Sequence, residues 1–330
     1  MRIVAIANGG FAIPTLCALK DSRHEVVAAI VMPLRTKRSG SKAGIPPVRA
    51  AVEEYLPETP VYSPENINSP EGVELIKSFN ADLFFICDYG RILAKEVIES
   101  TRLGGINLHG SLLPKYRGAA PINRAIQAGE RELGVSVIFI EPKVDAGPVV
   151  ATTSYVPSLE DTAVEIEATL AQMGARLVVE SLDRIESGSV EPLVQDASGV
   201  SKAPKIKKEE GHIDWSSSSE SIIDLYRAFQ PWPRVYSDWI SADSHKSTST
   251  RLILGPFSSF DQDGAAPVWV PEQYEDVPCG SVLLVTKTNF WIKTGNGALR
   301  ALAIQPAGKK PMSPEVFLRG YPIKVGDKLC

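Results

Sequence analysis

Short apolar runs alternate with segments of helical periodicity along the first half of the chain. The runs have the length of single strands and span residues 3–7, 26–31 and 83–87. Apolar side chains recur at helical spacing between them, over residues 11–19 and 71–79. Buried strands separated by helices are typical of a parallel sheet with helices on both faces. The pattern predicts a Rossmann-like, doubly wound α/β domain with a mostly parallel sheet.

The strand predicted over residues 105–109 is different, because polar and apolar residues alternate along it. Asn107 and His109 project from one face, followed by Ser111, whereas Ile106 and Leu108 project from the other. One face is therefore polar at the end of a strand. Open α/β sheets bind ligands at such strand ends.

A helix and a second, almost wholly apolar strand are predicted next. The helix begins near Pro121 and is ended by Gly129, and the strand spans residues 135–140. We expect a right-handed crossover between the strands 105–109 and 135–140, which makes them parallel. Asp145, which follows the second strand, then lies at the same sheet edge as His109.

The chain then loses its α/β alternation. Residues 149–156 predict a strand antiparallel to 135–140, and a helix follows in which Gly174 is expected to cause a break or bend. Residues 191–210 lack a sustained period and hold several lysines, which is typical of a linker.

The last third of the chain predicts a second domain. A helix over 216–229 is followed by short apolar runs separated by Gly, Asn and Ser, a pattern typical of a small β-barrel. The predicted organisation is a catalytic domain at 1–190, a linker at 191–210 and a barrel at 211–330. The apolar runs of the barrel are 235–240, 252–254, 282–285, 290–292 and 299–304.

Size and composition limit the class of protein. A chain of 330 residues is long for one core, in agreement with two domains. The four cysteines are scattered without paired spacing, so we expect neither disulfides nor a metal site. Met1 and Arg2 lead directly into the first strand, and no apolar run approaches membrane-spanning length. We therefore expect a cytoplasmic protein without a membrane or an evident protein partner.

An amide, an imidazole and a carboxylate at one sheet edge suit acyl transfer to an amine. Asn107 could donate a hydrogen bond to a developing oxyanion, and His109, held by Asp145, could stabilise the same oxygen or move protons. The alternative is that both residues serve only the fold, with His109 forming a buried hydrogen bond and Asp145 occupying a turn. An asparagine two residues before a histidine at a strand end favours catalysis.

The motifs around these residues give a specific resemblance. Asn107-x-His109-x-Ser111-Leu112-Leu113-Pro114-(x)3-Gly118, followed by Asp145-x-Gly147-Pro148, resembles the signature of the folate-dependent formyltransferases. Three downstream motifs resemble the C-terminal half of the methionyl-tRNA branch of that family. They are Ile213-Asp214-Trp215, Arg227-Ala228-Phe229-Gln230-Pro231-Trp232-Pro233 and Gln305-Pro306-Ala307-Gly308-Lys309-Lys310-Pro311-Met312.

The resemblance implies a formyltransferase domain followed by an OB-like barrel that binds tRNA. It assigns catalysis to Asn107, His109 and Asp145, with 10-formyltetrahydrofolate as donor and the methionine amine of initiator methionyl-tRNA as acceptor. Two segments that follow neighbouring strands are expected to form two walls of a folate cleft. Their residues are Tyr89, Gly90, Arg91, Ile92 and Leu93 on one side and Ser111, Leu112, Leu113 and Pro114 on the other.

Residues 32–50 predict a positively charged loop, because they contain five basic residues, no acidic residue, and several glycines and prolines. The resemblance implies that this loop contacts the tRNA acceptor stem. The candidate RNA-binding residues are Arg35, Lys37, Arg38 and Lys42. An ordinary solvated loop is the alternative.

Three other functions fit part of the pattern. A formyltransferase for a small amine, such as an amino sugar or glycinamide ribonucleotide, could use the same three catalytic residues. A hydrolase that releases formate from the folate would need no RNA surface, and a non-catalytic RNA-binding protein would leave the polar face around His109 without a purpose. The basic loop and the motif at 305–312 favour the tRNA acceptor.

Overall fold

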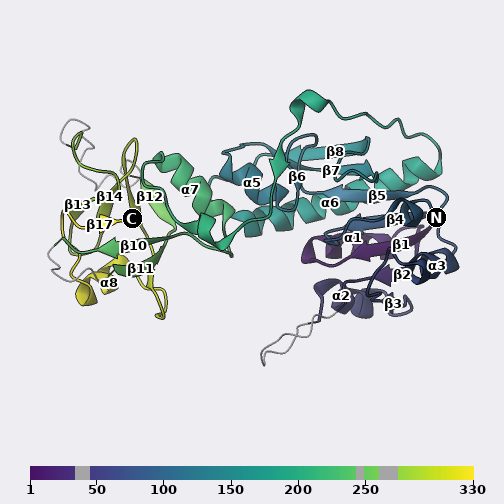
Figure 1. The fold of residues 1–330 in the computed structure, drawn as a ribbon, viewed down its shortest axis with the longest axis horizontal. Coiled ribbons are helices and arrows are strands. Elements are labelled where there is room, and N and C mark those ends of the chain that lie inside the picture. Colours follow the sequence, from purple (N-terminus) through teal and green to yellow (C-terminus); the bar gives the residue numbers. More distant parts are fainter. Residues whose placement is uncertain (34–44, 243–248, 260–273) are drawn as a thin grey trace. The chain divides into compact units, whose positions relative to one another are not determined.

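The computed structural model describes residues 1–33, 45–242, 249–259 and 274–330 (Figure 1). The chain divides into two compact units. The first comprises Met1–Ala125, Arg131–Leu159 and Glu165–Lys205, and the second comprises Ile126–Glu130, Glu160–Val164 and Ile206–Cys330. The main division after Lys205 falls within the stretch predicted as a linker, and the domain limits at 190 and 210 stay predictions.

The first unit is built on a seven-stranded sheet with the order β3-β2-β1-β4-β5-β7-β8. The five strands from β3 to β5 are parallel, and β7 and β8 continue the sheet in antiparallel pairing. The predicted mostly parallel sheet is therefore confirmed. Its strands are β1 Arg2–Ala7, β2 Glu25–Ile30, β3 Val61–Tyr62, β4 Leu83–Cys87, β5 Gly105–His109, β7 Leu133–Phe139 and β8 Val149–Tyr155.

Helices connect and flank these strands (Figure 1). They are the 3-10 turn η1 Gly10–Ala12, then α1 Ile13–Lys20, α2 Pro47–Tyr55, α3 Pro70–Ser78, α4 Lys95–Ile98, α5 Pro121–Gln127 and α6 Ala163–Glu186. The central strands β1 and β4 are buried along almost their whole length, as their unbroken apolar runs predict. Within the described residues, none of the helices combines the length and apolar character needed to span a bilayer.

The expected parallel crossover between β5 and β7 is wrong. The two strands are antiparallel, with Ile106 opposite Phe139 and His109 opposite Ser136. The connecting helix α5 has seven residues and spans about 10 Å, whereas the seven residues of β7 span about 23 Å. A helix this short does not carry the chain back across the sheet, so β7 starts near the edge where β5 ends.

Helix α6 is continuous over 24 residues, so the break expected at Gly174 is also wrong. A Cβ atom at Gly174 would lie 2.7 Å from Cδ2 of Leu108 in β5. The glycine therefore allows close packing of the helix on the strand and does not mark a helix end.

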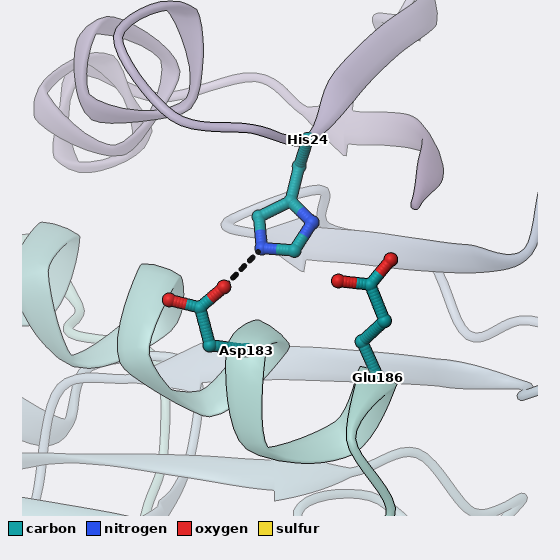
Figure 2. Close-up of side chains that lie close together, drawn as sticks. All are labelled: His24, Asp183 and Glu186. Carbon is teal, nitrogen blue, oxygen red and sulfur yellow. Dashed lines mark hydrogen bonds and ion pairs between the residues drawn. The ribbon is translucent and has the colours of Figure 1, made fainter.

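The far end of α6 is fixed by ion pairs. The side chain of His24, which is buried and immediately precedes β2, lies 3.2 Å from the Asp183 carboxylate (Figure 2). Arg23 binds both Asp183, at 2.6 Å, and Glu186, at 2.9 Å. Since Gly174 contacts the carboxyl end of β5 and Asp183 contacts the start of β2, α6 runs antiparallel to the parallel strands. Its early turns therefore lie at their carboxyl ends.

The contacts of His24 define its protonation state. Its Nδ1 lies 3.2 Å from the Met1 ammonium, which can only donate, and its Nε2 faces the Asp183 carboxylate, which can only accept. The neutral ring protonated at Nε2 satisfies both. Burial, followed by the charge of the Met1 ammonium, lowers the pKa of His24, against the opposing effect of Asp183 and Glu186.

This lowered pKa predicts an acid-sensitive contribution to stability. The unfolded chain takes up a proton on His24 as the pH falls through its ordinary value of 6.5, before the folded protein does. The free energy of unfolding should therefore fall with pH below about 6.5. Urea unfolding across this range should give a shallower pH slope for His24→Gln than for the unsubstituted protein. The exposed His212→Gln is the matched control, and equal slopes for all three proteins would contradict the prediction.

The second unit holds two four-stranded sheets, with the orders β16-β11-β10-β17 and β12-β15-β14-β13. All of their pairs are antiparallel, in agreement with the predicted C-terminal β domain. The predicted run at 299–304 is two strands in different sheets. The elements are α7 Ser219–Ala228, β10 Tyr236–Ile240, β11 Ser249–Leu254, β12 Phe257–Ser259, β13 Val282–Val285, β14 Phe290–Lys293, β15 Ala298–Ala301, β16 Ile304–Pro306, α8 Pro314–Gly320 and β17 Lys328–Leu329.

Candidate active site

A cleft of about 520 Å³ opens at the carboxyl ends of β4 and β5 in the first unit. The volume lies in the range of small-molecule sites. Its walls come mainly from the residues after β4, the end of β5, the start of α5, and the loop between β7 and β8, and Phe11 of η1 and Glu167 of α6 complete them. Asn107, His109 and Asp145 all line it, so the structure brings the three predicted catalytic residues to one cavity.

His109 is 5% exposed and is oriented from two sides. Its Nε2 lies 3.0 Å from the carbonyl oxygen of Tyr116, and its Nδ1 lies 3.6 Å from Oδ1 of Asp145. Both ring nitrogens thus face oxygen atoms that can accept a hydrogen bond. This arrangement suits a ring that holds a proton or passes it on during the reaction.

Asp145 lies in the loop between β7 and β8, as predicted, and its carboxylate joins two segments. Oδ2 accepts a hydrogen bond of 2.9 Å from the backbone N–H of Gly118, while Oδ1 faces His109. The residue has φ 49°, in the left-handed region. A Cβ at Gly147 would lie 1.8 Å from the carbonyl oxygen of Phe139, so only glycine permits the tight return of this loop.

Besides Glu141, two further carboxylates line the cleft, Asp88 after β4 and Glu167 on α6. Burial raises the pKa of Asp88, and burial together with the charge of Asp88 raises the pKa of Glu167. Solvent reaches both through the open cleft, although protein surrounds them. Neither carboxylate has a hydrogen-bond or ion-pair partner among the described residues. Sequence reasoning missed both, although Asp88 directly follows a predicted strand.

Comparison with known proteins identifies the family. The profile of the formyl transferase family matches residues 1–182, and the profile of its C-terminal domain matches residues 205–322. This chain belongs to the formyl transferase family. The resemblance inferred from the motifs is therefore confirmed, and the chain is an enzyme of the transferase class.

Relatives match along the whole chain. The methionyl-tRNA formyltransferase of Rhodopirellula baltica is 37% identical over 100% of this chain and 96% of its own. That of Methylococcus capsulatus is 37% identical over 97% of both chains.

Solved structures share the fold at low sequence identity. An N-formyltransferase from Helicobacter canadensis, in complex with folinic acid and dTDP-3-aminofucose, gives a TM-score of 0.58 at 17% identity. The match covers 91% of this chain and 98% of that one. HypX from Aquifex aeolicus in complex with tetrahydrofolic acid also gives 0.58 at 17% identity, over 100% of this chain and 50% of that one.

In this formyl transferase the two predicted folate segments occupy different positions. Tyr89, Gly90, Arg91, Ile92 and Leu93 line the cleft. Tyr89 is buried, and its hydroxyl has no hydrogen-bond partner in the part of the chain that the structure describes. A buried polar group without a partner is uncommon in folded proteins and costs stability.

The residues Ser111, Leu112, Leu113 and Pro114 are not among those that line the cleft. The Ser111 hydroxyl donates to the carbonyl of Lys115 at 2.7 Å, and Ser136 donates to the Ser111 carbonyl at 2.7 Å. This segment is therefore a packed turn beside the cleft, and its role in folate binding stays a prediction.

Two further groups are a cluster around His24, which is not part of the cleft, and the predicted RNA-binding residues. Among the described residues, His24, Asp183 and Glu186 bring one ligand atom each within 4.8 Å of one another, a spacing that could hold a metal ion (Figure 2). However, Arg23 already binds both carboxylates. The predicted RNA-binding residues Arg35, Lys37, Arg38 and Lys42 lie outside the described residues.

The geometry predicts the effect of removing each catalytic side chain. Asn107→Ala, His109→Ala and Asp145→Ala should each reduce formyl transfer by roughly a hundredfold or more, the effect of losing an oxyanion donor or a positioned acid or base. Steady-state formylation assays give the rates, and urea unfolding checks that each variant is folded. Near-normal turnover in all three folded variants would refute the catalytic assignment.

Proposed function

We propose that this enzyme transfers the formyl group of 10-formyltetrahydrofolate to the methionine amine of initiator methionyl-tRNA, giving N-formylmethionyl-tRNA for translation initiation. The observation that carries the proposal is the convergence of Asn107, His109 and Asp145 in one cleft of a chain whose full-length relatives are methionyl-tRNA formyltransferases. Formyl transfer needs no redox partner, and the three side chains provide the hydrogen bonds and proton transfers that it requires.

The reaction proceeds by addition and elimination. The neutral amine attacks the formyl carbon, a new C–N bond forms, and the carbonyl electron pair moves to oxygen. Asn107 donates a hydrogen bond to this oxyanion, and His109 stabilises it or carries a proton. The bond from carbon to N10 then breaks, its electron pair stays on N10, and N10 gains the proton that the attacking nitrogen loses. Asp145 holds His109 for this transfer.

The charge of the cleft favours an amine as acceptor. Among the described residues, its lining holds the carboxylates of Asp88, Glu141, Asp145 and Glu167 and one guanidinium, that of Arg91. A peptide α-amine has a pKa of about 8, and the amine of an aminoacyl ester is less basic, so part of the acceptor is an ammonium ion near neutral pH, which such a cleft attracts. Asp88 and Glu167, whose pKa values are raised, can accept its proton.

The choice of acceptor rests on the relatives. The sugar N-formyltransferases share the fold at 17% identity, whereas the methionyl-tRNA formyltransferases match the full length at 37%. We therefore favour tRNA over an amino sugar or glycinamide ribonucleotide. The proposal includes the folate and initiator methionyl-tRNA as partners, the C-terminal unit as a tRNA-binding domain, and a cytoplasmic location.

One assay separates the candidate functions. The protein is incubated with 10-formyltetrahydrofolate and, in parallel, with methionyl-tRNA, an amino sugar nucleotide, glycinamide ribonucleotide or water alone. Formyl transfer to methionyl-tRNA should exceed turnover with every other acceptor. Preferred formylation of a small amine would move the assignment to that branch of the family, and formate release from folate as the main product would indicate a hydrolase.

The basic loop gives a second, independent prediction. Neutralising Arg35, Lys37, Arg38 and Lys42 together should weaken tRNA binding and flatten its dependence on salt, because fewer phosphate contacts release fewer counterions. Folate binding should not change. Titrations of tRNA at several salt concentrations measure the slope, and an unaltered slope with unaltered formylation would exclude the loop as a tRNA contact.

A further inference from the structure

One side chain in the stretch 191–200 turns inward. Gln195 is partly buried, whereas the residues at 191–194 and 196–200 are exposed. The stretch lies between the two ranges matched by the family profiles, 1–182 and 205–322. Its lack of periodicity predicts a linker, so nothing in the sequence marks Gln195 as different from its neighbours.

The segment 193–203, called the strap from here on, is attached to the catalytic unit at both ends. Leu193 exchanges two backbone hydrogen bonds of 2.8 Å with Val149, the first residue of β8. At the other end, β9 Lys202–Ala203 pairs in parallel with β6 Arg117–Gly118. The strap therefore crosses from the loop of Asp145 to the segment of Gly118, the two segments that the Asp145 carboxylate joins.

Between these attachments Gln195 forms four hydrogen bonds. Its amide nitrogen donates to the carbonyl of Asp145 at 2.9 Å and to the carbonyl of Gly147 at 2.7 Å. Its amide oxygen accepts from Nε and Nη2 of Arg117 at 3.1 and 2.6 Å. Because a guanidinium only donates, the oxygen must face Arg117 and the NH2 group must face the loop. Every hydrogen-bonding position of the amide is used.

These contacts act on a residue whose backbone lies in the left-handed region. Asp145 has φ 49°, a conformation that a non-glycine residue adopts at a cost, and Gly147 makes the tightest approach in the loop. The Gln195 amide holds the two carbonyls that flank this turn. Without it, the turn can relax, and the Asp145 carboxylate then moves relative to both Gly118 N and His109 Nδ1.

We propose that Gln195, fixed by Arg117, is a positioning residue for formyl transfer that sets the place of the Asp145 carboxylate through the two backbone carbonyls of its loop. The inference rests on the proposed function. It extends the catalytic apparatus into the strap, outside both family matches. Gln195 does not line the cleft, so it acts through the loop that carries Asp145 and not by contact with the substrates.

The decisive variant is Gln195→Glu, which keeps the size and the acceptor for Arg117 but replaces the donating NH2 by oxygen. Two carbonyls would then face a carboxylate without a donor. If Gln195 only tied the strap to Arg117, this variant would be folded and active. Under the proposal, kcat for methionyl-tRNA formylation falls by about tenfold to a hundredfold, the effect expected when a catalytic group is misplaced by a fraction of an ångström to about 1 Å. The KM values for folate and tRNA change by no more than about twofold.

A double-variant cycle tests whether the effect passes through Asp145. In an Asp145→Ala background, Gln195→Glu should cause almost no further loss, whereas a general structural role would give losses that multiply. Gln172→Glu, the same change at an exposed position on α6, is the control and should keep normal turnover. Urea unfolding verifies that each variant is folded, and Gln195→Met, which removes all four hydrogen bonds, should show the same loss in kcat.

The outcomes separate the two proposals. If the unsubstituted protein formylates methionyl-tRNA and a folded Gln195→Glu retains its kcat, the positioning role is refuted. Losses that multiply with those of Asp145→Ala refute it as well. If the unsubstituted protein does not formylate methionyl-tRNA, the proposed function fails first, and that result is visible before any variant is compared.

Discussion

The bond between the Asp145 carboxylate and the backbone N–H of Gly118 is the constraint on which the site depends. It joins the β7–β8 loop to the segment after β5, and the other oxygen of the same carboxylate faces His109. The two strands concerned are antiparallel, so their ends alone do not bring the residues together. The loop must fold back along the sheet edge, and the close approach at Gly147 makes that return possible. The catalytic geometry is therefore a property of this loop as much as of the sheet.

The sequence predicted the parts of the fold that depend on burial. The apolar runs of β1, β2 and β4 and the polar alternation of Asn107 and His109 in β5 were enough to place a ligand site at the strand ends. Periodicity reports which face of a strand is buried but not its direction, and the antiparallel course of β7 was therefore missed. Gly174 was misread for a related reason, because helix propensity contains no information on the contact with Leu108.

The residues that support catalysis were less accessible to prediction than the catalytic residues themselves. Gln195 lies 50 positions after Asp145, whose carbonyl it binds, in a stretch without any repeating pattern. Its partner Arg117 lies 78 positions away, farther toward the N-terminus than Asp145. Such a network is defined only by tertiary contacts, whereas Asn107 and His109 are fixed by local alternation within one strand. Local patterns can thus identify the reacting groups while leaving out the groups that hold them.

The electrostatics of the cleft impose two opposite demands. Among the residues that the structure describes, carboxylates outnumber the guanidinium of Arg91 in the cleft lining, which favours a cationic amine but opposes the negative oxygen that forms during transfer. The oxyanion must therefore be stabilised by short-range donors. In the proposed mechanism the neutral amide of Asn107 serves this purpose without cancelling the field that attracts the amine. Once the amine has lost its proton, its attraction to Asp88 and Glu167 weakens as well. The free nitrogen can then move to the formyl carbon, so the same charge distribution that binds the acceptor does not retain it in an unreactive state.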